Sequence, residues 1–247
     1  MTERQKTILR LLSENQELTV ADLSRDLNVS GVTIRQDLEY LQSQRLLRRI
    51  HGGAILNNED EISIRIGINF ERKLHIAEYA ADMVEPGETI FIESGSVNAI
   101  FAQQLKTMTN LQVVTNNVFT ARTLKDSSVD VILIGGLYQH DSESLVGTVA
   151  QKGLANFNFS KCFIGIDGFD FESAFTSSDM MRAEVAALAV AKSPEVFVLT
   201  DSSKFGRRAL SCICNVSDVH HVVTDSQIPE DYRSFLTSAN ITLHVCP

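Results

Sequence analysis

The chain of 247 residues lacks any apolar run that approaches the roughly 18 residues of a membrane-spanning helix. It also lacks a cleavable apolar leader, because its first residues, MTERQKTILRLLSE, carry charge from the third position onward. The sequence therefore predicts a cytoplasmic protein with no membrane among its partners.

Cysteine is scarce, and its four positions are Cys162, Cys212, Cys214 and Cys246. So few cysteines argue against a disulfide scaffold, and the Cys212–Cys214 pair has no second pair of ligands with which to form a metal site. With 44% hydrophobic and 21% charged residues, the composition is that of an ordinary globular protein. We expect reduced, mostly buried thiols, no metal and no cofactor.

Acidic residues are absent between Tyr40 and Asn58, although the whole chain has a formal net charge of −9. The basic residues in this stretch are Arg45, Arg48, Arg49 and His51. Residues 1–57 hold 8 Lys and Arg and 7 Asp and Glu, whereas residues 58–247 hold 14 and 24, so their net charges are +1 and −10. Such asymmetry predicts two parts with different partners.

The first part is predicted to begin with two helices. Apolar residues recur at helical spacing in residues 3–14. Thr19 opens a second helix with Asp22 as a capping-box-like partner, and Leu23 and Leu27 form its apolar stripe.

A third helix follows, with Ser30 as its N-cap. Ile34, Leu38 and Leu41 fall at i, i+4 and i+7 and should face the core. The residues that should point away are Val32, Arg35, Gln36, Glu39 and Tyr40. Small residues followed by Arg and Gln suit a DNA major groove, where these two side chains pair with guanine and adenine edges. The alternative is an ordinary solvated helix face.

The segment LLRRIHGGAIL predicts a hairpin made of a basic strand, a Gly-Gly turn and a return strand. A basic hairpin directly after a helix-turn-helix is a winged helix, in which the wing contacts the phosphate backbone. This predicts double-stranded DNA as a partner. The expected contacts are Ser30, Val32, Thr33, Arg35, Gln36, Tyr40, Arg48, Arg49 and His51.

The motif LSRDLNVSGVTIRQDLEYL followed by LRRIHGGA resembles the N-terminal signature of the DeoR family of bacterial transcriptional regulators. The resemblance implies a DNA-binding regulator. Two positions depart from the family pattern. Gln36 stands where the family commonly has a second arginine, and Arg45 stands where it often has a glycine.

The second part alternates strands and helices, which predicts an α/β domain. Its strands are near-continuous apolar runs, as in a parallel sheet that is covered on both faces. The expected strands contain TIFI, LQVVT, VDVILIGG, KCFIGIDG, EVFVLTD, HHVVTD and ITLHVC. We expect a winged-helix domain over 1–57, a linker over 58–72 and the α/β domain over 73–247.

Polar and small residues follow these strands, and in open α/β sheets ligands bind at the carboxyl ends of the strands. Helix N-termini there offer N–H groups to phosphate, and lysine adds a point charge. The candidates are Glu93, Ser94, Gly95, Ser96, Asn98, Thr115, Asn116, Asn117, Gly135, Gly136, Asp167, Gly168 and Lys204. The alternative, simple turns, explains single glycines but not the convergence of Ser, Asn, Asp and Lys on one edge.

The stretches IGG, SLVG, FIGIDG, AEV and DSSKFG resemble the DeoR sensor domain, which is similar to sugar-phosphate isomerases of the ribose-5-phosphate isomerase and CoA-transferase-like fold. The resemblance implies a phosphorylated sugar or sugar-alcohol effector. It implies effector contacts at Ser94, Gly95, Ser96, Asp167, Glu184 and Lys204. Two residues after Glu184, where the family often has lysine, this chain has Ala186.

An active sugar-phosphate isomerase is the competing hypothesis, because Glu93, Asp167, Glu184 and Lys204 could supply its base and its cation. An isomerase does not need the N-terminal domain, so we favour a repressor of a carbohydrate-related operon that is not an enzyme. A ligand-free architectural DNA binder would leave the strand-end residues unexplained. Because one winged-helix domain makes few base contacts, we expect a homo-oligomer, either a dimer or a tetramer, that is assembled through the second domain.

Overall fold

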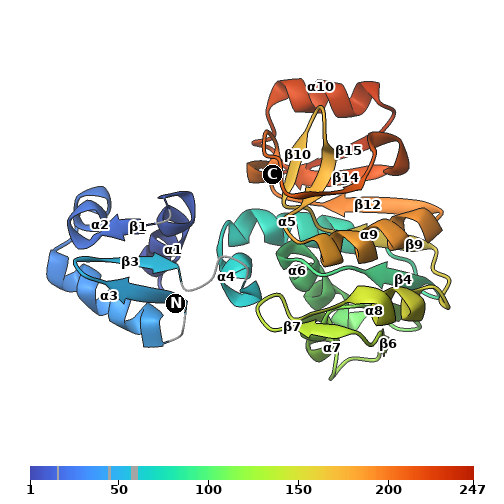
Figure 1. The fold of residues 1–247 in the computed structure, drawn as a ribbon, viewed down its shortest axis with the longest axis horizontal. Helices are drawn as coiled ribbons and strands as arrows, with labels where there is room; N and C mark the ends of the chain where they lie inside the picture. The colour runs from blue at the N-terminus through green and yellow to red at the C-terminus, as the bar shows by residue number, and fades with distance from the viewer. Residues whose placement is uncertain (16, 44–45, 57–60) are drawn as a thin grey trace. The chain divides into compact units, whose positions relative to one another are not determined.

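The computed structural model describes residues 1–15, 17–43, 46–56 and 61–247. The chain forms two compact units, Met1–Phe70 and Glu71–Pro247, each with its own core (Figure 1). Arg45, one of the basic residues noted above, lies outside the described residues.

The first unit is a small α+β domain. Its helices are α1 (Glu3–Asn15), α2 (Val20–Asp26), α3 (Gly31–Ser43) and α4 (Ile62–Gly67). The predicted starts of α2 and α3 are confirmed, because the Thr19 hydroxyl accepts a hydrogen bond from Asp22 N and the Ser30 hydroxyl accepts one from Thr33 N. Each such cap stabilises its helix by about 1 kcal/mol.

The core of this unit is made by the apolar stripes of its helices. Ile34, Leu38 and Leu41 of α3 are fully buried, as their spacing predicts. They pack in one cluster with residues of α1 and α2, including Leu12 and Leu23. Burial of each such side chain contributes about 1.5–3 kcal/mol, so the core fixes which face of α3 remains outside.

The hairpin is also confirmed, with β2 (Leu47–Ile50) antiparallel to β3 (Gly53–Leu56). The two turn glycines serve different purposes. Gly52 has φ +81°, a conformation that side chains disfavour, whereas a Cβ on Gly53 would lie 2.4 Å from the Leu18 carbonyl oxygen. Leu18 belongs to β1 (Glu17–Thr19), a third strand that pairs with β3 and that sequence periodicity did not reveal.

The segment expected to be a linker contains a helix. Residues 57–60 lie outside the described residues, and α4 begins directly after Glu61. Ile64 of α4 is fully buried in the core of the first unit. Helix α4 is therefore held to the first unit by apolar packing.

The second unit is built on a seven-stranded sheet in the order β15-β14-β12-β9-β4-β5-β6. All six pairings are parallel, which confirms the predicted sheet and its seven strands. The strands are β4 (Thr89–Ile92), β5 (Gln112–Thr115), β6 (Asp130–Leu133), β9 (Lys161–Ile164), β12 (Glu195–Leu199), β14 (His221–Asp225) and β15 (Thr242–Cys246).

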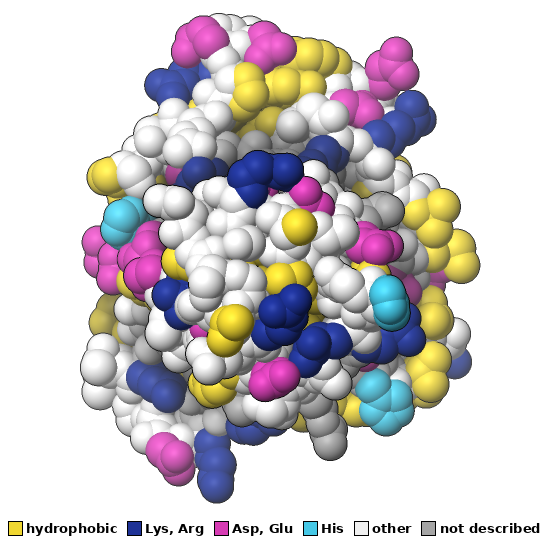
Figure 2. Space-filling view, turned by 90° about the vertical axis from the view of Figure 1, so that its left-hand side faces the viewer, with side chains coloured by type: hydrophobic (Ala, Val, Ile, Leu, Met, Phe, Trp, Pro, Cys, Tyr) yellow, Lys and Arg dark blue, Asp and Glu magenta, His cyan; other side chains and the backbone are white. Residues whose placement is uncertain are grey.

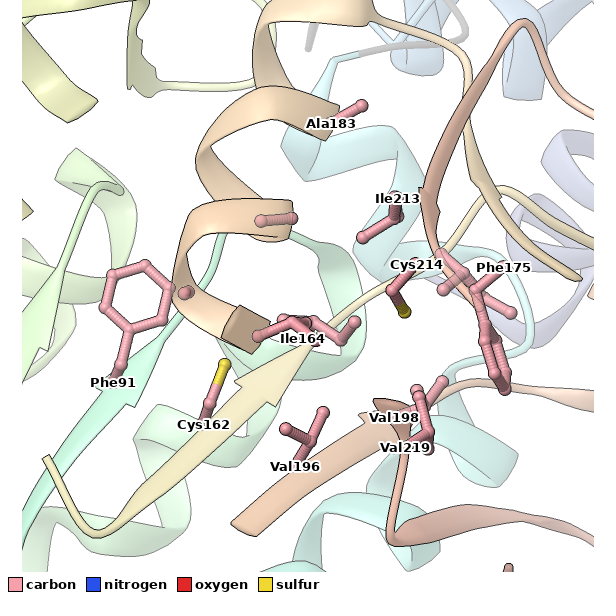
Figure 3. Packing of buried hydrophobic residues seen from close by; sticks show 14 of the residues in the cluster. Phe91, Cys162, Ile164, Phe175, Ala183, Val196, Val198, Ile213, Cys214 and Val219 are labelled. Carbon is pink, nitrogen blue, oxygen red and sulfur yellow. The ribbon is translucent and has the colours of Figure 1, made fainter. Parts of the chain in front are cut away.

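Helices cover both faces of this sheet. They are α5 (Phe70–Ala81), α6 (Ser96–Gln104), α7 (Val118–Thr123), α8 (Gly147–Leu154), α9 (Met180–Lys192) and α10 (Glu230–Ser238). Figure 3 shows one face, where Cys162, Ile164 and Val196 of the sheet pack with Ala183 of α9. On the other face the Phe101 ring of α6 lies 4.6 Å from the Phe163 ring of β9. Alternate residues of one strand thus enter opposite layers.

Two smaller sheets were not predicted. Strand β7 (Leu137–Gln139) pairs with β8 (Ser144–Val146). Strand β11 (Ala174–Ser177) lies between β10 (Gly168–Asp170) and β13 (Ser211–Cys214). Each smaller sheet follows a long parallel strand, β6 or β9, and therefore starts from the carboxyl edge of the main sheet.

Three of the four cysteines are buried, and none is in a disulfide. This agrees with the expectation of mostly buried thiols, and the exception is Cys212 of β13, which is exposed. Among the described residues, no helix is both long and apolar enough to cross a membrane.

Candidate functional site

The outer face of α3 presents the residues that the sequence assigned to DNA. Val32 is 62% exposed and Tyr40 is 43% exposed, and Arg35 and Gln36 are also exposed. The Ser30 and Thr33 hydroxyls hydrogen-bond each other at the start of the helix, at 2.8 Å. Arg35 and Gln36 are therefore the long polar side chains on the first turns of this face.

The orientation of α3 is fixed by a residue that the sequence did not single out. Asp37 is buried on the inner side of the helix, where it pairs with Arg4 of α1 and accepts a hydrogen bond from Gln5 Nε2 at 2.9 Å. Charged residues are rarely buried without partners, so Asp37 has to face α1. This contact therefore fixes the rotation of α3 about its own axis.

The wing carries the remaining predicted DNA contacts. Arg48, Arg49 and His51 are all exposed. Arg49 donates to Glu39 Oε1 of α3 at 2.9 Å, so it must exchange this carboxylate for a phosphate if it binds DNA. Figure 2 shows Lys and Arg side chains grouped near the middle of the face it presents, where isolated acidic side chains interrupt them.

In the second unit, the carboxyl end of β4 holds a buried carboxylate. Glu93 accepts hydrogen bonds from the Ser94 hydroxyl and, at 3.2 Å, from Gly165 N at the end of the neighbouring strand β9. Ser96 begins α6, so the free N–H groups of its first turn also lie at this edge. Glu93, Ser94 and Ser96 are thus brought together, as the sequence predicted for one loop.

Burial raises the pKa of Glu93 to about 7, although the two hydrogen bonds and the positive charge of Arg182 act to lower it. Asp167, at the end of β9, is a nearby negative charge that adds to the rise. A carboxyl group with such a pKa exists in both protonation states near neutral pH.

Asp167 and Arg182 link the end of β9 to the start of α9. Asp167 Oδ2 accepts hydrogen bonds from Ser178 N at 2.9 Å and from the Ser178 hydroxyl at 2.7 Å. Arg182 donates to the same hydroxyl at 3.3 Å and is 4% exposed. Sequence reasoning missed Arg182. Its position in the first turn of a helix that follows a strand, within SSDMMRAEV, was the available signal.

The carboxyl end of β12 holds a second charged cluster. Asp201 and Lys73 of α5 are both buried, with Lys73 Nζ 3.9 Å from Asp201 Oδ2. Burial acts to raise the pKa of Asp201, but the charges of Lys73 and Lys204 outweigh it and hold the pKa below its ordinary value. Lys204 belongs to the short 3-10 helix Ser202–Lys204 and is half-buried. Lys73 was not predicted, since nothing in its helical pattern distinguishes it.

Two buried amides at the same edge have an unpaired oxygen. Asn98 donates to the carbonyl oxygens of Glu93 and Phe163, and Asn116 donates to that of Leu145. The Oδ1 atoms of Asn98 and Asn116 accept no hydrogen bond from the described residues. Buried acceptors without donors are costly and rare in native proteins, so each of these two atoms is able to accept a hydrogen bond from a further donor.

Other candidates have structural partners in the fold. The Thr115 hydroxyl donates to Ile92 O, and Asn117 caps α7. Cβ atoms on Gly136 and Gly168 would lie 2.8 Å from Val146 O and 2.5 Å from Arg207 O, so close backbone packing explains both glycines.

Position along the sheet divides the candidates further. Strand β6, which precedes Gly135, lies four strands from β12, or about 19 Å, more than one sugar phosphate spans. Strand β4 lies two strands from β12, about 10 Å. Glu184 is exposed and accepts a hydrogen bond from Gln151 of α8, while Ala186 is buried in the core. The compact cluster is therefore at the ends of β4, β9 and β12.

The titration of Glu93 should make stability depend on pH. Its pKa is about 7 in the folded chain against an ordinary value of 4.5, so between these values the folded state keeps a proton that the unfolded state has lost. We expect the free energy of unfolding to fall by roughly 3 kcal/mol, relative to Glu93→Gln, as the pH rises through this window. Urea unfolding of both proteins measures the difference, since other groups titrate alike in the two. A difference that does not change with pH would contradict the assignment.

An exposed recognition helix with a basic wing, joined to an α/β unit with a polar strand-end cluster, defines a ligand-responsive transcriptional regulator. Residues 4–60 match the model of the DeoR-like helix-turn-helix domain, and residues 68–226 match that of the DeoR C terminal sensor domain. The chain belongs to the DeoR family of transcriptional regulators, as its motifs predicted.

Relatives of the same length support this assignment. The HTH-type transcriptional regulator GolR of Listeria innocua is 32% identical over 239 residues, which cover 94% of each chain. The glycerol-3-phosphate regulon repressor of Escherichia coli is 30% identical over 249 residues, which cover 99% of each chain.

Solved structures show more distant similarity. The probable sor operon regulator from Shigella flexneri aligns with a TM-score of 0.46 and 12% identity, over 65% of this chain and 87% of that one. Ribose 5-phosphate isomerase A from Methanocaldococcus jannaschii aligns with a TM-score of 0.41 and 16% identity, over 56% of this chain and 55% of that one.

Proposed function

We propose that the protein is a cytoplasmic repressor of a carbohydrate-related operon and that a phosphorylated sugar or sugar alcohol controls its binding to DNA. The observation that carries the proposal is the cluster at the ends of β4, β9 and β12. It combines buried charges with the unpaired amide oxygen of Asn98. The unpaired oxygen of Asn116 lies next to it along the edge, at the end of β5. The names of the relatives, which include repressors of the glycerol-3-phosphate regulon and of a lactose phosphotransferase system, support a sugar-related role.

In this proposal the effector's phosphate binds Lys204 and the first-turn N–H groups of α6 beside Ser94, Gly95 and Ser96. Its hydroxyls donate to Asp167 and to the unpaired amide oxygens, because carboxylate and amide oxygens accept hydrogen bonds. Glu184 and the glycines after β6 lie outside this compact set.

The test is a binding assay with the promoter fragment that the protein protects in its own genome. Glycerol 3-phosphate, ribose 5-phosphate, fructose 1-phosphate and glucose 6-phosphate are added in turn. One of them should change the affinity for DNA and raise the unfolding temperature, since a ligand at 100 times its dissociation constant adds about 2.7 kcal/mol of stability. If no sugar phosphate in this panel alters either quantity, the effector proposal is wrong.

One observation favours the second candidate function, an isomerase. A pKa of about 7 for Glu93 is a value that suits a general base. However, each oxygen of this carboxyl group already accepts a hydrogen bond, from Ser94 or Gly165, and the group is buried away from solvent. We therefore propose that the protein is not an enzyme, and turnover of any panel member by the purified protein would overturn this.

The protein should be at least a dimer in solution. A single winged-helix domain contacts too few base pairs for the usual operator affinities. An operator with two-fold symmetry is bound by two such domains at a fixed spacing. We propose that the second unit makes the contact, because the small first unit uses its apolar residues in its own core. Light scattering at micromolar concentration measures the mass, and a monomer both with and without DNA would contradict the prediction.

Replacing Arg48 with alanine should weaken binding to all DNA sequences equally. Arg48 is exposed on the wing, and we expect it to contact phosphate rather than bases. Loss of one phosphate contact should reduce the slope of log K against log salt by about 0.9. Anisotropy titrations over a salt series measure the slope. Arg208→Ala, which removes the same charge from an exposed site on the second unit, should leave it unchanged. A selective loss of operator binding in Arg48→Ala would instead indicate base contact.

A further inference from the structure

We infer that Lys73 couples the effector site to the DNA-binding unit through its ion pair with Asp201. This inference rests on the proposed function, since it assigns the regulation of the same strand-end site. Lys73 Nζ lies 3.9 Å from Asp201 Oδ2, and the charge of Lys204 also acts on this carboxylate.

The position of Lys73 in the chain is what makes it a coupling residue. Helix α5 begins at Phe70, which is the last residue of the first unit, and Lys73 lies in the first turn of the helix. Because α5 leads into β4, its first turn lies at the carboxyl edge of the sheet, where the effector cluster is. The chain thus enters the second unit at the edge that binds the effector.

The Lys73–Asp201 contact is long for a buried ion pair. The side chains are only 5% and 2% exposed, yet Lys73 Nζ and Asp201 Oδ2 are 3.9 Å apart, which is longer than a direct charged hydrogen bond of about 2.8 Å. Within a buried site the attraction between opposite charges is poorly screened, so small changes of distance carry large changes of energy.

An anionic group on Lys204 would change this balance. Lys204 and Lys73 both attract Asp201, and together they hold its pKa down. When a phosphate neutralises Lys204, the attraction of the Asp201 carboxylate to Lys73 outweighs its attraction to Lys204, and it draws the first turn of α5 toward β12.

The rest of α5 is held by separate contacts. His75 Nδ1 lies 3.1 Å from Pro247 O, and the Tyr79 hydroxyl lies 3.3 Å from His244 Nδ1 on β15. These contacts confine the movement to the first turn, next to the segment that leads from the DNA-binding unit. Effector binding thereby moves the first turn of α5 and changes the conformation of the chain where it leaves the DNA-binding unit.

The test compares Lys73→Met with Lys161→Met, using the panel sugar phosphate that gives the largest response in the wild type. Lys161 is a matched control, because it is also a largely buried lysine paired with a carboxylate, Glu88, at 3.0 Å, but it lies at the amino end of β9. Both changes should lower the unfolding temperature. The ratio of operator affinities without and with effector should fall close to one in Lys73→Met and remain at the wild-type value in Lys161→Met.

Effector affinity separates coupling from binding. By calorimetry, Lys73→Met should still bind the sugar phosphate, and with the same affinity whether or not operator DNA is present, because coupling is reciprocal. Lys73→Arg keeps the charge and should retain the response. Should Lys73→Met be too unstable, Lys73→Gln provides the same comparison.

A wild-type response in Lys73→Met or Lys73→Gln would overturn the inference, as would a Lys73→Arg protein that is as unresponsive as Lys73→Met. These outcomes differ from failure of the proposed function, in which the wild type itself shows no response to any sugar phosphate of the panel.

Discussion

Replacing Lys204 with alanine is expected to abolish the influence of the sugar phosphate on operator binding. In the proposed site Lys204 supplies a cation at the end of β12, so the variant should bind the effector's phosphate far more weakly. Coupling of roughly 1–3 kcal/mol corresponds to about 5–150-fold regulation, and this whole factor should disappear. Operator binding without effector should stay near the wild-type value, since Lys204 lies outside the DNA-binding unit.

Anisotropy titrations of labelled operator, with and without the effector, measure the effect of Lys204→Ala. Lys192→Ala is a suitable control, because Lys192 is also half-buried but donates to Ala155 O from the last turn of α9. It should respond normally. If Lys204→Ala also responded normally, or lost operator binding without effector, the placement of the phosphate at Lys204 would be wrong. Calorimetry distinguishes this variant from Lys73→Met, which should keep effector binding.

Replacing Arg35 with alanine is expected to relax the choice of operator sequence. The side chain is exposed on the second turn of α3, where it can pair with a guanine edge in the major groove. Loss of such a pair costs roughly 1–3 kcal/mol, so preference at one or two base pairs should fall by about 5–150-fold. Binding to random DNA should change much less.

Competition between operator and random DNA measures this preference for Arg35→Ala. Arg25→Ala removes the same charge from α2, where Arg25 is 73% exposed and paired with Asp22, and should keep the wild-type ratio. An unchanged ratio of specific to random binding in Arg35→Ala would show that α3 is not the recognition helix.

The sequence by itself determined the elements of the first unit. The caps at Thr19 and Ser30, the spacing of Ile34, Leu38 and Leu41, and the basic hairpin are local patterns, because each depends on residues within a turn or two of one another. Such patterns also determined the seven parallel strands, whose apolar runs require helices on both faces.

Only the tertiary structure decided how these elements are fixed and which polar residues meet. The Asp37 contact with Arg4 and Gln5 joins residues more than thirty positions apart, and the Lys73–Asp201 pair joins α5 to the end of β12. No periodicity in a single segment encodes such contacts. Hence Arg182 and Lys73 were missed at the strand-end cluster.

The tertiary structure also gave Gly136 and Gly168 a packing role that the sequence could not distinguish from a role in ligand binding. A glycine that admits a ligand and a glycine that admits a neighbouring backbone look alike in a sequence, because both simply lack a side chain. Local patterns therefore determine secondary structure and its exposed faces, whereas the composition of a site depends on which distant segments the folded core brings within a few ångströms.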